Sequence, residues 1–372
     1  MELYFISVIF AILPYCRSEL KLLQVLFRHG ARTPDEEVPK MYYLKDPYIN
    51  MTYFPAGFGG LTNAGKMMEY ELGEFFRERY GSFLGPIYSS DFVTFQSSNK
   101  ERTKMSAQLV AAGLYPPSEI QKWHPDLPWQ PIPIRSESLN SDLLFLGFQI
   151  CPNVQRIRHE ALHTDEHLLA HTKNLTEFDR FMSMNTGVNA TGVKNAVLYE
   201  HLYAQMSLGL ELPAWTRTIF PNGKLNEVAS FEHVIQSYTK PLKRANGGMW
   251  VEEWLKNIDD HLNDTLSFQR KAHFYCGHDL NIAALLIVLN VFQLHMPQYA
   301  SAIMFELHKE SDEYLIKTIY KNGGDIEELI IPECGKLMCP LSTFRQLYAD
   351  LLKDDAQRIC HGTPIAKINV PD

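Results

Sequence analysis

Apolar positions along the first 115 residues alternate between strand spacing and helix spacing. The pattern predicts strands at 21–27 and 87–95 and helices at 61–80 and 100–114. The first strand, K-L-L-Q-V-L-F, is a short apolar run, whereas the helices place apolar side chains on one stripe. Gly113 and the prolines at 116–117 end the second helix. The order strand, helix, strand, helix is typical of an α/β unit.

The middle of the chain has a different pattern. Residues 154–243 are mainly polar with helical spacing and contain no strong strand run, which indicates a helical insertion. Strand and helix patterns then return, with a helix at 249–262, a strand at 273–276, a buried helix at 281–291 and a hairpin of strands at 299–308 and 313–321.

Composition and charge narrow the class of protein. The chain has 372 residues, 45% of them hydrophobic, and Lys and Arg (35) are outnumbered by Asp and Glu (43), giving a net charge of −8. Such a chain is globular and has no bulk basic field to hold nucleic acid or an anionic membrane. We therefore expect no nucleic-acid partner and no membrane partner, and any anion site must be built locally.

Features at the N-terminus and along the surface predict secretion. Residues 1–18 begin with a nearly continuous apolar run followed by small and polar residues, which predicts a signal peptide, and no later segment is long and apolar enough to span a bilayer. The chain also carries four N-x-S/T glycosylation acceptors, Asn50, Asn174, Asn189 and Asn263. We expect a secreted, extracellular glycoprotein.

Cysteine usage agrees with an oxidising compartment. If Cys16 leaves with the signal peptide, five cysteines remain, an odd number that predicts two disulfides and one spare thiol. Cys276 lies in an apolar run and is expected to be the buried free thiol. No C-x-x-C pair occurs, so the cysteines do not indicate a metal site.

One short segment concentrates the candidate chemistry. The first predicted strand runs directly into R-H-G-A-R-T-P at residues 28–34, and ligands of open α/β sheets bind just beyond the carboxyl ends of strands. Two guanidiniums beside an imidazole suit a phosphate, because arginine forks bind anionic oxygens and offset the repulsion that a nucleophile meets. A neutral imidazole can attack phosphorus. The segment favours phosphoryl transfer through His29, and the alternative is a surface loop with solvated Arg28 and Arg32.

Four further blocks follow that segment in order. They are G-L-T-N-A-G at 60–65 with its helix to Tyr80, E-R-T-K-M-S-A at 101–107 running to Pro117, W-Q-P-I-P at 129–133, and G-H-D at 277–279. With the R-H-G-x-R-x-P signature, the chain resembles the histidine acid phosphatase family from about residue 21 to residue 360. The blocks at 62–80 and 102–117 are most similar to secreted insect enzymes, including venom forms.

The resemblance implies a role for each matching residue. His29 is the expected nucleophile, Asp279 the proton donor to the leaving alcohol, and the phosphoryl oxygens are held by Arg28, Arg32, Arg102 and His278. A carboxylic acid must carry a proton to donate it, so turnover is expected to favour acidic pH. No metal and no cofactor are implied. Asp279 also has a simpler reading as a helix N-cap, a role it can hold at the same time.

The resemblance also implies an architecture. It predicts an α/β domain with a central mixed sheet flanked by helices, from residues 19–153 and 245–372, and a smaller, mainly helical cap inserted at 154–244. The disulfides that it implies are Cys151 with Cys360 and Cys334 with Cys339. Relatives form dimers, so a homodimer is expected.

Other functions within and outside the family stay open. The expected substrates are small phosphate monoesters or phosphopeptides. A non-catalytic secreted binder of phosphorylated ligands is disfavoured because every residue of the motif set is present. A phytase, an inositol-polyphosphate phosphatase or a mutase shares the phosphohistidine chemistry, and the mixed charge of residues 154–243 favours simple monoesters over polyanions.

A second motif points elsewhere. H-E-A-L-H at residues 159–163 matches the H-E-x-x-H pattern of zinc proteases, in which two histidines on one helix face bind zinc and the glutamate acts as base. Glu166 stands where the extended zinc-protease pattern needs glycine, and His167 and His171 continue the helical spacing. A polar, solvated helix face is the favoured interpretation.

Overall fold

The computed structural model describes residues 18–263 and 270–361. The predicted signal peptide at 1–18 lies, apart from Ser18, outside the described residues. The strands are β1 (Glu19–Arg28), β2 (Val93–Ser97), β3 (Ile134–Arg135), β4 (Ala272–Gly277), β5 (Ala302–Glu310), β6 (Glu313–Asn322), β7 (Asp325–Leu329) and β8 (Met338–Pro340).

Helices make up most of the remaining chain. They are α1 (Glu37–Tyr42), α2 (Asn63–Leu84), α3 (Glu101–Leu114), α4 (Leu143–Ile150), α5 (Pro152–Thr164), α6 (Glu166–Asn174), α7 (Thr176–Thr186), α8 (Val193–Ser207), α9 (Lys224–Gln236), α10 (Lys240–Ala245), α11 (Gly247–Leu262), α12 (Asp279–Val288), α13 (Leu341–Leu352) and α14 (Ala356–His361), with a short 3₁₀ turn at Ala214–Thr216.

All the strands join one sheet in the order β3-β2-β4-β1-β5-β6-β7, with β8 paired to β6. The strands β3, β2, β4 and β1 run parallel, whereas β5, β6 and β7 continue the sheet in antiparallel register. The predicted α/β class with a mixed central sheet is confirmed. The predicted hairpin is β5 with β6, joined by a tight turn at Ser311.

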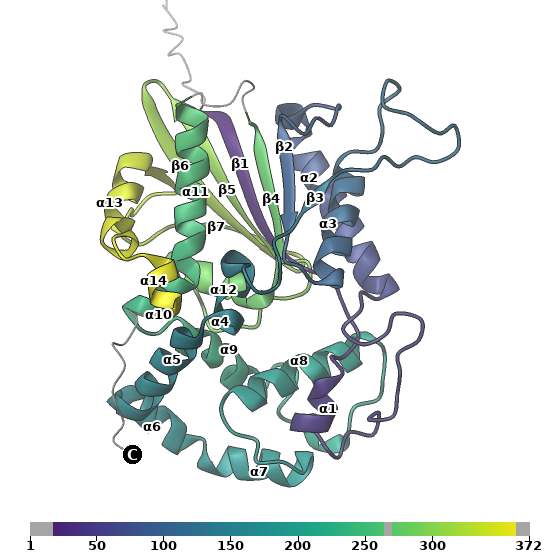
Figure 1. Cartoon of the computed structure of the whole chain (residues 1–372), viewed down its shortest axis with the longest axis vertical. Coiled ribbons are helices and arrows are strands. Elements are labelled where there is room, and N and C mark those ends of the chain that lie inside the picture. The colour runs from purple at the N-terminus through teal and green to yellow at the C-terminus, as the bar shows by residue number, and fades with distance from the viewer. Residues whose placement is uncertain (1–17, 264–269, 362–372) are drawn as a thin grey trace, which may run out of the picture.

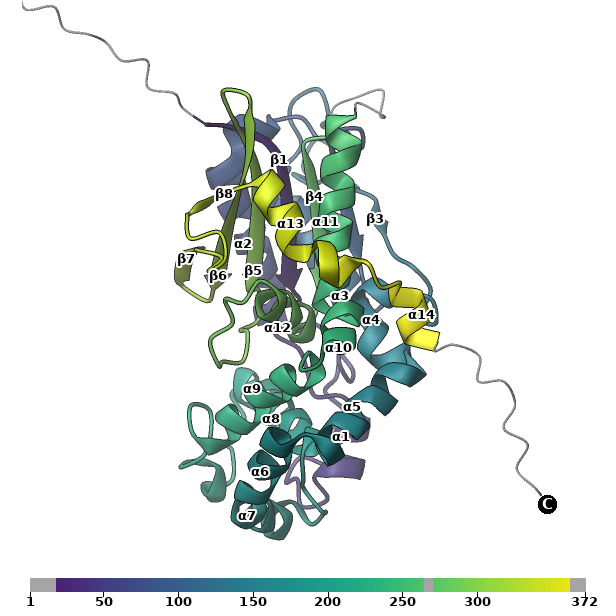
Figure 2. The ribbon, with the colours of Figure 1, turned by 90° about the vertical axis from the view of Figure 1, so that its left-hand side faces the viewer.

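Strand β1 lies at the centre of the sheet because it is apolar on both faces. Leu22 and Leu26 pack into one core with α11, α12 and α13, while Leu23 and Val25 pack into the other with α2 and α3. A strand covered on both sides reads as a continuous apolar run rather than an alternating one. Figure 2 shows the sheet nearly edge-on, with α2 on one side and α11 and α13 on the other.

The helical insertion gathers at one end of the sheet. Helices α5 to α9, together with α1, lie beyond the carboxyl ends of β1, β2 and β4 (Figure 1). They have their own apolar core, formed around Met182, Leu198, Leu202 and Leu225. The insertion touches the α/β part where α9 packs on α12. The expected cap boundaries at 154 and 244 remain a prediction.

Several predicted elements have different ends. The helix expected at 61–80 is α2 at Asn63–Leu84, and the strand expected at 299–308 is β5 at Ala302–Glu310. The strand expected at 87–95 begins only at Val93, because the amides of Phe92 and Val93 both donate to the Ser89 carbonyl and hold the preceding residues in a turn. The helix expected at 281–291 spans Asp279–Val288 and is followed by Asn290 in a left-handed conformation (φ 59°). Its N-cap is His278, so the N-cap role considered for Asp279 is wrong.

Cysteines join segments that are far apart in the sequence. The structure pairs Cys151 with Cys360 (Cα–Cα 4.6 Å), which ties the start of α5 to α14, and Cys334 with Cys339 (Cα–Cα 5.5 Å) between β7 and β8. Cys276 is a buried free thiol.

The two disulfides should contribute unequally to stability. They close loops with sequence separations of 209 and 5 residues, so the chain-entropy account assigns about 5 and about 2 kcal/mol to them. We expect the double variant C151S/C360S to unfold at a clearly lower temperature than C334S/C339S, measured by calorimetry on matched samples. An equal or reversed order would show that the long-range bridge does not restrain the unfolded chain as proposed.

Candidate active site

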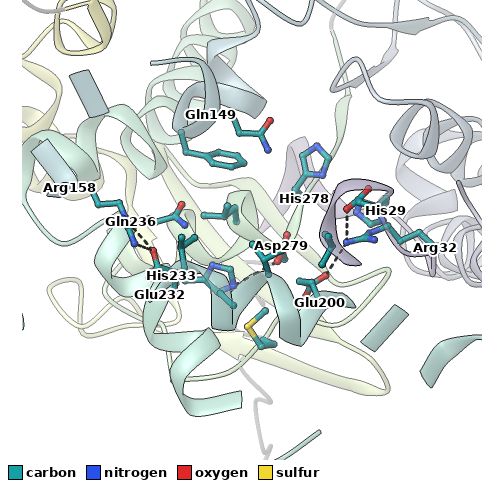
Figure 3. A pocket seen from close by; sticks show the side chains of 18 of the residues that line it. His29, Arg32, Gln149, Arg158, Glu200, Glu232, His233, Gln236, His278 and Asp279 are labelled. Carbon is teal, nitrogen blue, oxygen red and sulfur yellow. Dashed lines mark hydrogen bonds and ion pairs between the residues drawn. The ribbon is translucent and has the colours of Figure 1, made fainter. Parts of the chain in front are cut away.

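A cleft of about 340 Å³ opens between the sheet and the helical insertion. Its floor contains His29, Arg32, Arg102, His278 and Asp279, which come from the ends of β1 and β4 and from α3 and α12. Five of the six residues predicted for catalysis or phosphate binding therefore line one cavity, and the sixth, Arg28, lies behind them. Figure 3 shows the opposite wall, built by side chains of α8 and α9.

His29 is held in one orientation at the centre of the floor. Its Nδ1 lies 2.8 Å from the Gly30 carbonyl oxygen, and its Nε2 lies 3.1 Å from Arg102 Nε, which donates to it. These partners assign the proton to Nδ1 and leave a lone pair on Nε2. Burial, then the charges of Arg102 and Arg28, hold the pKa of His29 well below its ordinary value. The imidazole is therefore neutral and nucleophilic at acidic pH.

The loop that carries His29 is fixed by a close backbone contact. A Cβ on Gly30 would meet the Gly65 carbonyl oxygen at 2.3 Å, and one on Gly65 would meet the Ala31 carbonyl oxygen at 2.0 Å. Only glycine at both positions allows this approach. Thr62 caps α2 by accepting from the Gly65 amide at 3.0 Å and donates to the Ala31 carbonyl at 3.1 Å. The start of α2 thus holds the loop against the end of β1.

Carboxylates pair with the three arginines, and Arg102 Nη1 lies 3.7 Å from Asp35 Oδ1. The contacts of Arg28 and Arg32 are closer. Arg28 Nη2 lies 2.5 Å from Glu200 Oε2, and its Nη1 donates to the Pro297 carbonyl. Arg32 Nη2 lies 3.1 Å from Asp35 Oδ2 and 3.9 Å from Glu200. Within the described residues, the Nε atoms of Arg28 and Arg32 have no hydrogen-bond partner. Both guanidiniums are fixed in place and still have a donor to offer.

The pair His278-Asp279 stands at the start of α12. His278 donates its amide to Asn281 Oδ1 at 2.9 Å, and its Nε2 lies 3.0 Å from Ser98 Oγ. Burial and Arg102 lower the pKa of His278 to about 3, so this imidazole is neutral. Because the positive end of the α12 dipole faces the cleft, the site favours an anion.

Asp279 is ionised in the unliganded site. Burial acts to raise the pKa of its carboxyl, but Arg28, His233 and His278 outweigh burial and lower that pKa to about 2. Three guanidiniums (Arg28, Arg32, Arg102) thus stand among three carboxylates (Asp35, Glu200, Asp279), and an entering phosphate adds negative charge. An added anion raises the pKa of the carboxyls around it.

Sequence patterns missed the residues that complete the site. Glu200 and His233 come from α8 and α9 of the helical insertion, and Asp35 follows the motif by one residue. Asp35 stands three residues after Arg32, a spacing at which opposite charges pair. No local pattern distinguishes Glu200 or His233 from other polar residues on amphipathic helices.

The competing zinc motif lies on α5 away from the floor of the cleft. His163 Nδ1 bonds the His159 carbonyl at 2.7 Å and Glu160 pairs with Arg156 at 3.0 Å, both on an exposed helix face. Within 18–263 and 270–361, no three His, Cys, Asp or Glu side chains are grouped as metal ligands would be.

In the same ranges no helix has the length and apolarity that a membrane crossing requires.

Comparison with known families agrees with the geometry. The model of the histidine phosphatase superfamily (branch 2) matches residues 19–321, which include all six predicted catalytic and phosphate-binding residues. The chain belongs to this superfamily. The resemblance that the motifs indicated is therefore confirmed.

Members of this superfamily with high similarity are acid phosphatases by name. A venom acid phosphatase of Apis mellifera is 37% identical over 355 residues, covering 92% of this chain and 88% of the relative. Human prostatic acid phosphatase is 32% identical over 357 residues, covering 93% and 89%. Human lysosomal acid phosphatase is 32% identical over 364 residues, covering 94% and 82%.

Solved structures with the same fold are more distant in sequence. A phytase from Citrobacter braakii superposes with a TM-score of 0.67 at 16% identity, covering 90% of this chain and 98% of the phytase. Hafnia alvei phytase in complex with myo-inositol hexakis sulphate gives 0.67 at 18% identity, covering 92% and 99%. At this identity the likeness concerns the fold alone.

The arginine beside His29 should control its ionisation. Because the charge of Arg102 opposes protonation of His29, R102Q should raise the pKa of His29, read from its ring resonances in an NMR titration. K104Q, which removes one positive charge from the same helix, should leave that pKa unchanged. An unshifted pKa in R102Q would mean that burial and the other nearby charges, and not Arg102, keep this imidazole neutral.

Proposed function

We propose that this protein is an acid phosphatase that hydrolyses phosphate monoesters through a covalent phosphohistidine on His29. The observation that carries the proposal is the unprotonated Nε2 of His29, fixed by the Gly30 carbonyl and flanked by Arg102. A neutral imidazole surrounded by guanidiniums is equipped to attack an anionic phosphoryl group. The similarity to relatives named acid phosphatases supports the same activity.

In the first half-reaction, Nε2 of His29 attacks phosphorus while the bond to the leaving oxygen breaks. The phosphoryl oxygens are held by Arg28, Arg32, Arg102 and His278, of which Arg32, Arg102 and His278 line the cleft. Asp279 gives its proton to the leaving alcohol. In the second half-reaction, water attacks phosphorus, Asp279 takes a proton from the water, and the nitrogen–phosphorus bond breaks to release inorganic phosphate.

The proton on Asp279 arrives with the substrate. The empty site keeps this carboxyl ionised, whereas a phosphate monoester loses its second proton near pH 6. A bound monoanion brings the proton, and its negative charge raises the affinity of Asp279 for that proton. The rate should therefore fall as the pH rises through about 6, and the low pKa of His29 should preserve the nucleophile well below that pH.

Small monoesters and phosphopeptides are the proposed substrates. The wall facing the arginines carries the carboxylates Glu200 and Glu232, the latter buried and paired with Arg158. A polyanion such as an inositol polyphosphate would meet these carboxylates without spare cations, which disfavours the phytase alternative. The apolar side chains Val193 and Met296 on the same wall suit an organic leaving group.

We also propose that the protein acts in an extracellular compartment. Disulfides persist where the surroundings are oxidising, and the structure contains two. The four acceptor asparagines are all exposed, so each is accessible to glycosylation. The similarity to a relative named as a venom enzyme agrees with secretion.

The activity is tested by p-nitrophenyl phosphate hydrolysis between pH 4 and 8, with and without EDTA. We expect an EDTA-resistant rate that is greatest at acidic pH, and ³²P that remains on the denatured protein after rapid quenching in alkali, where phosphohistidine survives. H29A should retain its fold and lose both signals. Turnover by H29A, or a rate abolished by EDTA, would overturn the proposed chemistry.

The role of Asp279 is tested with leaving groups of different basicity. An alkoxide needs a proton to depart, whereas p-nitrophenolate does not. We expect D279N to slow an alkyl phosphate such as glycerol 2-phosphate by about 10²-fold to 10³-fold and p-nitrophenyl phosphate far less, measured as kcat. Equal losses for both substrates would exclude a proton-donor role.

A further inference from the structure

We propose that His233 is a positioning residue that holds Asp279 and relays its proton as substrate binds and phosphate leaves. This inference rests on the proposed phosphatase function and extends it to a residue outside the signature motifs. His233 comes from α9 of the helical insertion and lines the cleft beside Asp279 (Figure 3). Its Nε2 lies 3.8 Å from Asp279 Oδ2.

The imidazole of His233 lacks the contacts of a structural histidine. Only 5% of the residue is exposed, yet within the described chain neither ring nitrogen has a hydrogen-bond partner. Buried polar atoms are normally satisfied by a partner. His201 on α8 differs in that its Nε2 lies 2.7 Å from Asp46 Oδ2, although its Nδ1 is unpartnered too. His233 has no hydrogen bond among the described residues at either nitrogen to offset the cost of its burial.

The separation from Asp279 suits a contact that closes during catalysis. A distance of 3.8 Å leaves no room for an intervening water and is about 0.6 Å beyond the usual upper limit of an N–H···O hydrogen bond. Catalytic hydrogen bonds are often long in unliganded sites and shorten in the substrate complex. A small shift of α9 against α12, which pack together, would bring the two side chains into contact.

The charges facing His233 come from several elements. Asp279 on α12 favours the imidazolium, whereas Arg28 on β1 and His295 in the loop before β5 oppose it. On α9 itself, Glu232 turns away to Arg158, and Glu200 on α8 pairs with Arg28. Burial dominates this balance and lowers the pKa of His233 to about 4.

Because of these charges, the proton affinity of the His233 imidazole changes when the substrate binds. At pH 5 the imidazole is neutral, and it gains affinity for a proton when phosphate adds negative charge. Once protonated, His233 can pass that proton to Asp279 Oδ2, so that some of the ester that enters as a dianion still reacts and the rate falls less steeply above about pH 6 than it would without His233. After phosphate departs, the same path returns the proton and Asp279 becomes an anion again.

The experiment compares H233Q, H233L and the control E227Q. Glutamine fills the site and can hydrogen-bond Asp279 but cannot titrate, while leucine can do neither. Glu227 lies on the exposed face of α9, pairs with Lys224 and does not line the cleft. We expect H233L to lower kcat for glycerol 2-phosphate about 10-fold to 100-fold, with little change in KM and a much smaller loss for p-nitrophenyl phosphate.

The pH dependence of kcat distinguishes a proton relay through His233 from a purely structural role of this residue. H233Q should match wild type near pH 5, where the substrate brings its own proton, and fall below it above pH 6, where the dianion dominates. E227Q should retain the wild-type profile. A wild-type profile in H233Q, or equal losses for the two substrates in H233L, would overturn the proposal.

A double variant distinguishes this proposal from the function on which it rests. Because His233 acts through Asp279, H233Q/D279N should be no slower than D279N alone, whereas independent roles would multiply their effects. Multiplied losses would overturn the relay and leave the phosphatase assignment intact. Failure of the wild-type protein to form a phosphoenzyme would instead remove the proposed function itself. Binding of inorganic phosphate and the unfolding temperature verify that each variant is folded.

Discussion

The ion pair between Arg28 and Glu200 determines how the two parts of the molecule meet. Arg28 ends β1 and Glu200 stands on α8. Arg28 also stacks on Tyr299 at 4.5 Å and donates to the Pro297 carbonyl. Removing one partner of a buried pair leaves an uncompensated charge, which costs about 3 to 5 kcal/mol. The pair therefore joins α8 to the carboxyl end of β1, beside the packing of α9 on α12.

The same pair sets the charge of the cleft. Arg28 is shared between Glu200 and Asp279, so the positive charge that keeps Asp279 ionised is itself partly neutralised. This balance makes the proton affinity of Asp279 depend on whether phosphate is present. A carboxyl with a fixed high pKa would hold a proton at all times, and one beside an unshared arginine would release it too readily. The proton affinity of Asp279 therefore changes when phosphate binds, because Glu200 and Asp35 already neutralise part of the charge of the arginines.

Sequence patterns predicted the parts of the fold that depend on local periodicity. The apolar run of β1, the amphipathic stripe of α2 and the hairpin of β5 and β6 are visible in the chain because each buries a continuous face. The short strands β7 and β8 and the helices α1, α13 and α14 were not predicted, since their positions depend on pairing and packing with distant segments. Likewise, the motif residues predicted the floor of the cleft. Glu200 and His233 could not be predicted, because only the folded chain brings them to Arg28 and Asp279.

The floor and the wall of the cleft come from different parts of the molecule. The fold itself recurs in phytases at 16–18% identity. The residues proposed to bind phosphate stand at the ends of β1 and β4 and the starts of α3 and α12, which the sheet fixes relative to one another. The opposite wall comes from α8 and α9, which have a core of their own. The role proposed for His233 on α9 therefore separates from phosphate binding, because the two sets of residues stand on different elements.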